Sequence, residues 1–378
     1  MFLWKMDITL KQRFKTLKEK LFADITEVPI VLQQSYLPGL DGLRGISIIM
    51  VISSHLAMYT PLMEYFNGAI GVEIFFVISG FLITSLLLKE KVKRGTVSFK
   101  NFYIRRILRI VPVAYLFLLV LMMLNTRLQL GISLKSFIAS FLYIRNVPFK
   151  NTYDWYTSHF WSLSVEEQFY ISFPFFIVAK TNKFIIGAAV IILTVPLLVI
   201  LGFNNVWIFY SNHIVHVVTF IIIVLLGKGT TSILVGSLYA ILLFKKVIVI
   251  DKLRSNYFVS FGFLIFSFLV LMRISYLHTE YLSVILFPVI IGYVILLNLK
   301  EKNLLRYFLD SALLTKIGVL SYSLYIWQQL FTTTQKWNLF KYSDTMVVRV
   351  FLLFLVSFIS YYFFEKFFLR YKAKFKYS

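Results

Sequence analysis

An arginine and a histidine with the potential for chemistry share one apolar stretch near the amino terminus. Within Leu37–Leu56, Arg44 is followed eleven residues later by His55. On an α-helix, eleven residues rise about 16 Å and complete about three turns, so both side chains lie on one face. An ionisable group is costly in hydrocarbon, and a histidine there usually faces protein or a water-filled cavity. The pair is a candidate site, although a snorkelling arginine and a histidine that only bridges two helices would give the same pattern.

Two carboxylates inside apolar stretches are candidates to act with this pair. Glu73 lies in the second apolar stretch, and Glu166 lies near the outer end of a later one. Each is suited either to neutralise an arginine or histidine within a helix bundle or to bind a polar substrate. We expect His159 and Glu167 to be solvated. No set of His, Asp and Glu has metal-ligand spacing, so we expect no metal site.

Three arginines stand at the entry to the third apolar stretch. The segment FYIRRILRIVP places Arg105, Arg106 and Arg109 within about one helical turn. Guanidinium groups bind phosphate oxygens bidentately, so these arginines suit a multiply charged phosphate ligand. The alternative is that they determine topology and touch lipid headgroups, and charge alone favours that alternative.

The composition predicts a membrane protein. Of 378 residues, 59% are hydrophobic, and the mean hydropathy is +0.79, which soluble domains do not reach. The net charge of +22 is explained by Lys and Arg clustered between spans, so we expect no nucleic-acid partner. The absence of cysteine excludes disulfides, thiolate metal ligands and a cysteine nucleophile.

Apolar length and positive charge predict an all-α, polytopic bundle of about ten transmembrane helices. The predicted spans are about 44–62, 69–88, 108–125, 161–179, 184–203, one pass within 206–244, 257–273, 281–299, 313–333 and 346–364. Keeping the basic loops on one side places both termini in the cytoplasm and residues 126–160 outside.

Two apolar stretches are ambiguous in this count. Residues 132–144 are too short to span, so we expect them to be buried or interfacial. Residues 206–244 are broken at Gly227–Ser232, and we count one pass with the remainder interfacial or re-entrant. Both choices keep the following lysines in the cytoplasm.

The chain divides into a membrane domain at 37–368 and two basic ends. In 1–36, basic and apolar residues interleave without a signal-peptide pattern, which predicts an amphipathic cytoplasmic segment on the anionic inner leaflet. A disordered basic tail is the alternative. Residues 369–378 form a basic cytoplasmic tail.

Five sequence blocks occur in a fixed order along the chain. They are LDGLRGISIIMVISSHL (Leu40–Leu56), GVEIFFVISGFLIT (Gly71–Thr84), FYIRRILRIVP (Phe102–Pro112), WSLSVEEQFYISFP (Trp161–Pro174) and SYSLYIW (Ser321–Trp327). In content and order they resemble the acyltransferase-3 family of integral membrane acyltransferases, which acylate sugars and polysaccharides. The resemblance covers about 36–368 and implies about ten spans and, for bacterial members, the inner membrane.

The resemblance implies an acyltransferase reaction. The donor would be cytoplasmic acyl-CoA, most often acetyl-CoA, and the acceptor a hydroxyl of a cell-envelope or exported carbohydrate such as a polysaccharide, lipopolysaccharide or peptidoglycan. Many members carry an additional SGNH-type domain at the carboxyl end. This sequence ends soon after its last predicted span, so we expect a stand-alone member.

The resemblance also implies roles for the candidate residues. The phosphates of acyl-CoA would be held by Arg44, Arg105, Arg106 and Arg109, with the pantetheine arm along the first helix. His55 would take the proton from an attacking hydroxyl, since imidazole titrates near neutral pH, or would carry the acyl group itself. Glu73 or Glu166 would orient the ring or bind the sugar.

The chain departs from the family pattern at particular positions. SYSLYIW is usually followed by histidine, where this chain has Gln328. A late Glu-x-Pro pattern is represented by Glu365 without the proline. Two other classes remain open: a proton-coupled transporter or flippase using the same ionisable residues, and a non-catalytic binding subunit.

Overall fold

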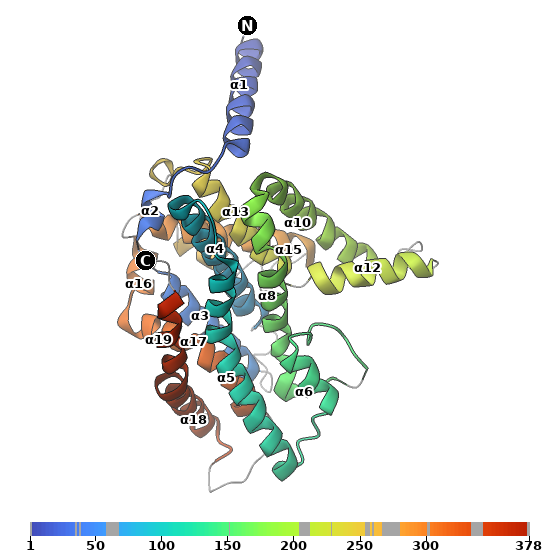
Figure 1. Ribbon diagram of the computed structural model, residues 1–378. Coiled ribbons are helices and arrows are strands. Elements are labelled where there is room, and N and C mark those ends of the chain that lie inside the picture. Colours follow the sequence, from blue (N-terminus) through green and yellow to red (C-terminus); the bar gives the residue numbers. More distant parts are fainter. Residues whose placement is uncertain are drawn as a thin grey trace.

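The computed structural model is built of helices (Figure 1). It describes residues 2–34, 36–37, 39–57, 68–150, 152–203, 212–227, 229–253, 258, 261–266, 280–300, 303–333 and 343–375. Within these ranges the chain forms α-helices, one π-helical segment and two short 3-10 segments, and no β-strand. The described part of the chain is therefore all-α, as the sequence predicts.

Five of the described helical segments are long and apolar enough to cross a membrane. They are α3 (Leu40–Ala57), α4 (Ala69–Arg94), α5 (Phe99–Leu128), the Thr181–Val199 part of α10 (Thr181–Phe203), and the helical run Met346–Phe375. This last run consists of α18 (Met346–Ile359), η3 (Ser360–Glu365), α19 (Lys366–Lys372) and η4 (Ala373–Phe375). They support a multi-pass membrane protein. The total of ten spans and the sides of the two termini stay predictions, and the span at 257–273 falls mostly outside the described residues.

A bent helix pair adds a sixth candidate span. Helices α12 (His213–Leu226) and α13 (Thr230–Phe244) meet at 53°. The break begins at Gly227, within the segment where the sequence predicts an interruption. The pair forms either one broken span or a re-entrant loop.

Two short stretches differ in how well the sequence predicts them. Helix α6 covers only Leu134–Phe141, too short to cross a bilayer, as expected. The span predicted at 161–179 is broken, because α8 (Phe160–Ser172) ends before Pro174 and α9 (Pro174–Ala179) begins there. Proline lacks the N–H needed to continue a helix and disfavours helical geometry in the residue before it.

Helices α3, α4 and α17 (Ala312–Phe331) form the centre of the bundle that positions the site. Helix α4 packs against α3 and α13, and α3 packs against α17. A Cβ on Gly318 would overlap the main-chain oxygen of Asp41, so only glycine permits this approach of α17 to α3. Helix α15 (Glu280–Lys300) packs on α13, and α16 (Leu304–Leu309) on the start of α3.

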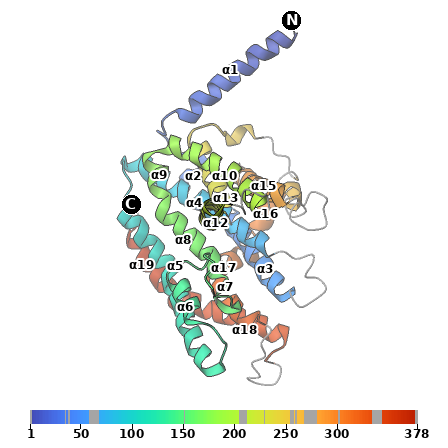
Figure 2. The same ribbon diagram turned by 90° about the vertical axis from the view of Figure 1, so that its right-hand side faces the viewer.

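The amino-terminal helix stands apart from the bundle. Helix α1 (Phe2–Phe22) projects away from the other helices in both views (Figures 1 and 2). Its side chains from Gln12 to Lys20 are exposed. The amphipathic cytoplasmic segment at 1–36 and its contact with the inner leaflet stay predictions. Helix α2 (Ile30–Gln33) follows it and lies against the bundle.

Candidate functional site

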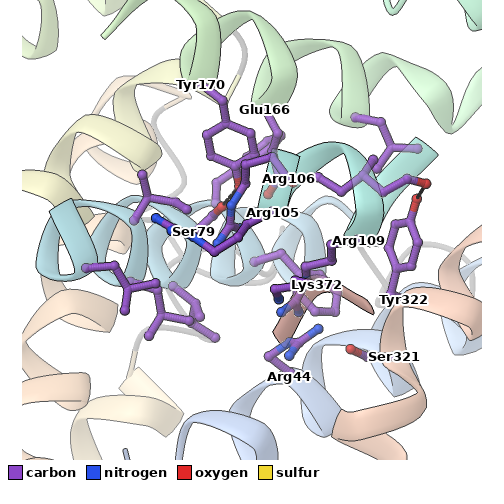
Figure 3. A pocket seen from close by; sticks show the side chains of 18 of the residues that line it. Arg44, Ser79, Arg105, Arg106, Arg109, Glu166, Tyr170, Ser321, Tyr322 and Lys372 are labelled. Carbon is purple, nitrogen blue, oxygen red and sulfur yellow. Dashed lines mark hydrogen bonds between the residues drawn. The ribbon is translucent and has the colours of Figure 1, made fainter. Parts of the chain in front are cut away.

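A cavity of about 770 Å³ lies between helices of the central bundle (Figure 3). Its walls come from α3, α4, α5, α8 and α17, with contributions from α2 and α19. The polar and charged lining residues are Gln33, Arg44, Ser79, Lys89, Lys93, Arg94, Arg105, Arg106, Arg109, Ser162, Glu166, Tyr170, Ser321, Tyr322, Tyr325 and Lys372. The cavity therefore brings together the four arginines singled out in the sequence and one of the two carboxylates.

The cavity has a large excess of positive charge. Eight of its described lining residues are Arg or Lys, and one is a carboxylate, Glu166. In the close-up, Arg44, Arg109 and Lys372 lie close together (Figure 3). Arg106 lies beside Tyr170 and Glu166 in a neighbouring group. Such a concentration of fixed cations favours a ligand with several negative charges.

A tight turn explains why basic residues of two helices face each other. Helix α4 ends at Arg94 and is followed by Gly95, whose φ of +74° is the left-handed conformation that glycine adopts without strain. Helix α5 then begins behind Ser98, whose hydroxyl accepts a hydrogen bond from the N–H of Asn101 at 3.3 Å. The connection between the two helices is short, and it brings Glu90 near the end of α4 within hydrogen-bond distance of Arg105 on α5.

Arg105 has a structural partner in this turn. Its Nη2 donates to Oε2 of Glu90 at 3.1 Å, and its Nη1 donates to the main-chain oxygen of Phe375 at 2.8 Å. The other oxygen of Glu90 accepts from the N–H of Ser98 at 2.9 Å. Glu90 is buried, so Arg105 joins α4, α5 and the carboxyl-terminal segment as well as lining the cavity.

The ion pair of Arg44 and the ring contact of Arg106 are longer than the hydrogen bonds of Arg105. Arg44 lies 3.5 Å from the carboxylate of Asp41, one turn earlier on α3. The guanidinium of Arg106 lies 5.7 Å from the centre of the Tyr170 ring, a cation–π arrangement. Tyr170 in turn hydrogen bonds Ser79 of α4. Glu166 is close enough to Arg44, Arg106 and Arg109 to attract all three electrostatically.

Lys89 anchors the short helix α2 beside the cavity. Its ammonium donates to the main-chain oxygens of Leu32, Gln33 and Gln34 at 2.9, 3.1 and 3.3 Å. These oxygens belong to the end of α2, where carbonyls lack helical partners. Lys89 thus holds Gln33 in the cavity wall.

The opposite end of the cavity is largely apolar. Val72 and Phe75 of α4 line it together with Tyr325 of α17. Tyr325 shares a hydrogen bond of 2.5 Å with Ser162 and packs edge-on against Phe75, with ring centres 6.3 Å apart. From Val72 to Lys93, α4 rises about 31 Å, so the cavity is long. Charge gathers toward one end and apolar surface toward the other.

His55 lies beyond this apolar end and does not line the cavity. Its Nδ1 lies 2.6 Å from Oε1 of Gln328, which follows Tyr325 by one turn on α17. Its ring packs edge-on against Trp155 of α7 (Trp155–Ser158), with ring centres 5.2 Å apart. The four predicted arginines therefore line the cavity, whereas His55 contacts α17 one turn beyond the cavity residue Tyr325.

The other sequence predictions meet mixed outcomes. The structure does not place Glu73 on the His55 ring. The carboxylate of Glu73 accepts a hydrogen bond from Ser232 on α13. The prediction that His159 is solvated is wrong: the residue is 2% exposed, and its ring lies among Phe117, Phe160 and Tyr325. It precedes α8 directly, where the chain turns inward after α7. Glu167 is also more buried than expected.

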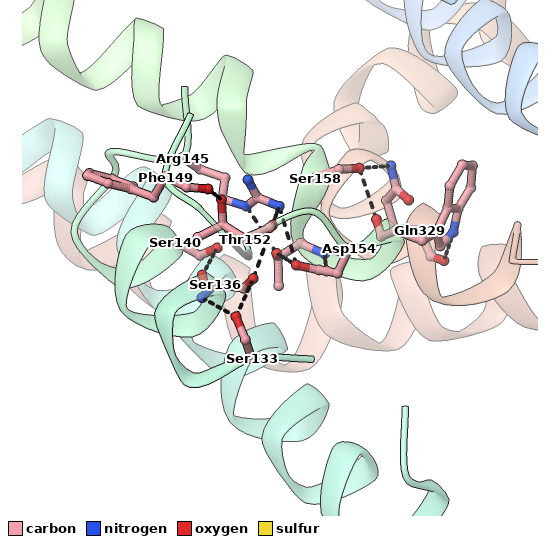
Figure 4. A network of polar contacts seen from close by, with 11 residues as sticks. Ser133, Ser136, Ser140, Arg145, Phe149, Thr152, Asp154, Ser158 and Gln329 are labelled. Carbon is pink, nitrogen blue, oxygen red and sulfur yellow. Dashed lines mark hydrogen bonds and ion pairs between the residues drawn. The ribbon is translucent and has the colours of Figure 1, made fainter. Parts of the chain in front are cut away.

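A polar network at the far end of the bundle supports α7 (Figure 4). Arg145 forms an ion pair with Asp154 at 3.3 Å and donates to the hydroxyl of Thr157 at 3.2 Å and to the main-chain oxygen of Thr152. Asp154 caps α7 by accepting from the N–H of Thr157 at 2.7 Å. Sequence reasoning did not single out Arg145 or Trp155.

The chain belongs to the acyltransferase-3 family of membrane acyltransferases. The family model, described as an acyltransferase domain, matches residues 37–365, which includes the cavity and His55. No solved structure gives a significant match.

Named relatives are bacterial. The chain is 38% identical over 155 residues to a protein of Staphylococcus aureus (strain COL) provisionally named an O-acetyltransferase. It is 40% identical over 156 residues to YrhL of Bacillus subtilis, provisionally named a peptidoglycan O-acetyltransferase, and 36% over 157 residues to the peptidoglycan O-acetyltransferase OatA of Listeria monocytogenes. Each match covers 38% of this chain and 24–25% of the relative, so it spans about a quarter of these proteins.

Proposed function

We propose that this protein is a multi-pass O-acetyltransferase of the cytoplasmic (inner) membrane. It would move an acetyl group from acetyl-CoA, bound in the arginine-lined cavity, to a hydroxyl of a cell-envelope carbohydrate. The observation that carries the proposal is the distribution of charge in the cavity. Eight of its described lining residues are basic, and Tyr325 at its apolar end lies one turn of α17 before Gln328, which contacts His55. Family membership supports acyl transfer.

The shape and charge of the cavity suit acetyl-CoA. The phosphates of the nucleotide would lie among Arg44, Arg106 and Arg109, whose guanidinium groups match phosphate oxygens. The uncharged pantetheine arm would follow α4 toward Phe75 and Tyr325. Because the cavity is long, the thioester would be carried away from the phosphates and toward His55.

His55 would act as the general base. The acceptor hydroxyl gives its proton to the imidazole while its oxygen bonds to the thioester carbonyl carbon. The tetrahedral intermediate then breaks its carbon–sulfur bond, and the imidazolium returns the proton to the leaving thiolate. The products are the acetyl ester and free CoA, and His55 is regenerated. An acetyl group carried on the imidazole would instead leave a transient acetyl-histidine.

Peptidoglycan is the acceptor that the relatives favour. Two of the named relatives carry peptidoglycan O-acetyltransferase in their names. We therefore propose a hydroxyl of a peptidoglycan sugar as the first acceptor to examine, ahead of a surface polysaccharide or lipopolysaccharide. The polar far end of the bundle, with Trp155 against His55, is where the sugar would approach.

The binding of acetyl-CoA tests the proposed donor site. Arg109→Ala should raise the dissociation constant of acetyl-CoA at least tenfold, because one charge-assisted hydrogen bond is worth about 1.5–3 kcal/mol. Isothermal titration calorimetry of the purified protein in nanodiscs gives this constant. The matched control is Arg127→Ala, an exposed arginine in the last turn of the same helix. Equal affinity in the two variants would contradict the proposed donor site.

A further inference from the structure

Gln328 is the polar side chain that the structure places on the imidazole of His55. Its Oε1 lies 2.6 Å from Nδ1 of His55. Gln328 is fully buried on α17, and the hydroxyl of Thr332 lies 3.4 Å from the same Oε1. Thr332 also donates to the main-chain oxygen of Gln328 at 2.9 Å. Since the single hydroxyl proton of Thr332 goes to that main-chain oxygen, the imidazole of His55 is the close partner of the amide oxygen.

The contact determines which ring nitrogen carries the proton. An amide oxygen only accepts hydrogen bonds, so the nitrogen facing it must be protonated. Neutral imidazole has a single N–H, and with that proton on Nδ1 the lone pair is on Nε2. A general base needs its lone pair on the nitrogen that meets the substrate.

We propose that Gln328 is a positioning residue that holds His55 in the Nδ1–H tautomer and thereby presents Nε2 as the base. This inference rests on the proposed role of His55 in acetyl transfer. The acceptor proton moves to Nε2 and returns from Nε2 to the leaving thiolate. Because an amide has no basic site at neutral pH, the proton on Nδ1 stays in place throughout, and Gln328 is chemically unchanged.

A second contact orients the ring but does not select a tautomer. Trp155 packs its ring against His55 at an interplanar angle of 67°. Its indole N–H donates to the main-chain oxygen of Gln329 at 2.9 Å, so the indole is tied to α17 as well. An aromatic ring in this position restricts the tilt of the imidazole. Selection of the protonated nitrogen therefore depends on Gln328.

The neighbouring glutamine provides a matched control. Gln329 is also buried on α17, and its side chain donates to the hydroxyl of Ser158 at 3.2 Å. Its contact with Trp155 uses the main-chain oxygen, which a substitution retains. Gln328→Leu and Gln329→Leu thus remove the same chemical group from adjacent buried positions, and only the first removes the partner of His55.

Nitrogen NMR of histidine-labelled protein in nanodiscs tests the inference without any substrate. The chain has five histidines, so His55→Asn identifies the signals of His55. We expect Nδ1 protonated and Nε2 with a lone pair in the wild type and in Gln329→Leu. Gln328→Leu should show a mixture of both tautomers. Gln328→Glu, which has the same shape and still accepts from Nδ1, should retain the wild-type tautomer even if the leucine variant fails to fold.

Transfer kinetics supply the second measurement. Gln328→Leu should lower kcat for acetyl transfer at least tenfold and leave the dissociation constant of acetyl-CoA unchanged, because Gln328 lies outside the donor cavity. A proton on Nε2 in the wild type, or an unchanged tautomer in Gln328→Leu, would overturn the inference. If the tautomer is as expected but His55→Ala still transfers acetyl groups, the proposed function fails and the Gln328 contact stands.

Discussion

Glu90 forms a buried ion pair with Arg105 of the cavity wall. It sits 1% exposed near the end of α4 and takes hydrogen bonds from Arg105 and from the N–H of Ser98. A buried carboxylate that satisfies both an arginine and a helix start is costly to remove, because the partner charge would stay buried alone. Arg105 is therefore a structural residue as well as part of the cavity wall.

Replacement of this carboxylate should destabilise the protein. We expect Glu90→Gln to lower the free energy of unfolding by about 3 kcal/mol, the usual cost of breaking a buried ion pair from one side. Thermal unfolding in detergent measures the change. Glu19→Gln on the exposed helix α1 serves as the control and should leave the midpoint unchanged. A midpoint for Glu90→Gln that equals the control would show that the pair contributes little.

At the scale of elements, the short helix α7 connects the loop after α6 to His55. It carries Trp155 onto His55, and the pair Arg145–Asp154 fixes its start. Both members of this pair are about one-tenth exposed. Because Arg145 and Trp155 do not line the cavity proposed to bind acetyl-CoA, the Arg145 network and the cavity should affect different steps of the proposed reaction.

Loss of the Arg145–Asp154 ion pair should therefore slow the proposed acetyl transfer without weakening the proposed binding of acetyl-CoA. In Arg145→Met we expect cellular O-acetylation to fall several-fold while the dissociation constant of acetyl-CoA stays within twofold of the wild type. The physical reason is a looser α7 and a less ordered Trp155. Lys150→Met, an exposed change in the same loop, should behave as wild type. A weaker acetyl-CoA affinity in Arg145→Met would contradict this separation.

The long apolar helices and the arginine cluster were predictable, whereas the irregular elements were not. Apolar length locates α3, α4, α5 and α10 because each is a continuous hydrophobic run. The break at Pro174 was missed because hydropathy does not register a missing N–H. The burial of His159 was not predicted because it depends on contact with Tyr325 of α17. Trp155 was not singled out because its position depends on a hydrogen bond to Gln329 of the same helix. A family departure marked Gln328, but only the fold places it on His55.

At the scale of the whole molecule, the two ends of the bundle carry different charged groups, which suggests the side from which each proposed substrate enters. The cationic part of the cavity lies beside the α4–α5 turn, and the Arg145 network lies at the opposite end near α6 (Figures 1 and 4). If the basic turn faces the cytoplasm, as the positive-inside rule predicts, the donor enters from the cytoplasm and the acceptor from outside.

Cysteine labelling tests this orientation directly, since the chain has no cysteine of its own. Lys150→Cys, in the loop after α6, should react with a membrane-impermeant maleimide once its access from outside is opened by removing the cell wall. Thr96→Cys, exposed in the α4–α5 turn, should react only after the membrane is permeabilised. The opposite pattern would reverse the proposed topology.

The most direct test of the account is the O-acetyl content of the cell-envelope glycans, measured by mass spectrometry. The gene is deleted and then restored as wild type or as His55→Ala, with membrane levels of both forms matched. We predict that deletion removes an acetyl ester from peptidoglycan and that only the wild type restores it. Full restoration by His55→Ala would contradict the catalytic role of His55, and an unchanged ester content after deletion would contradict acetyl transfer to these glycans.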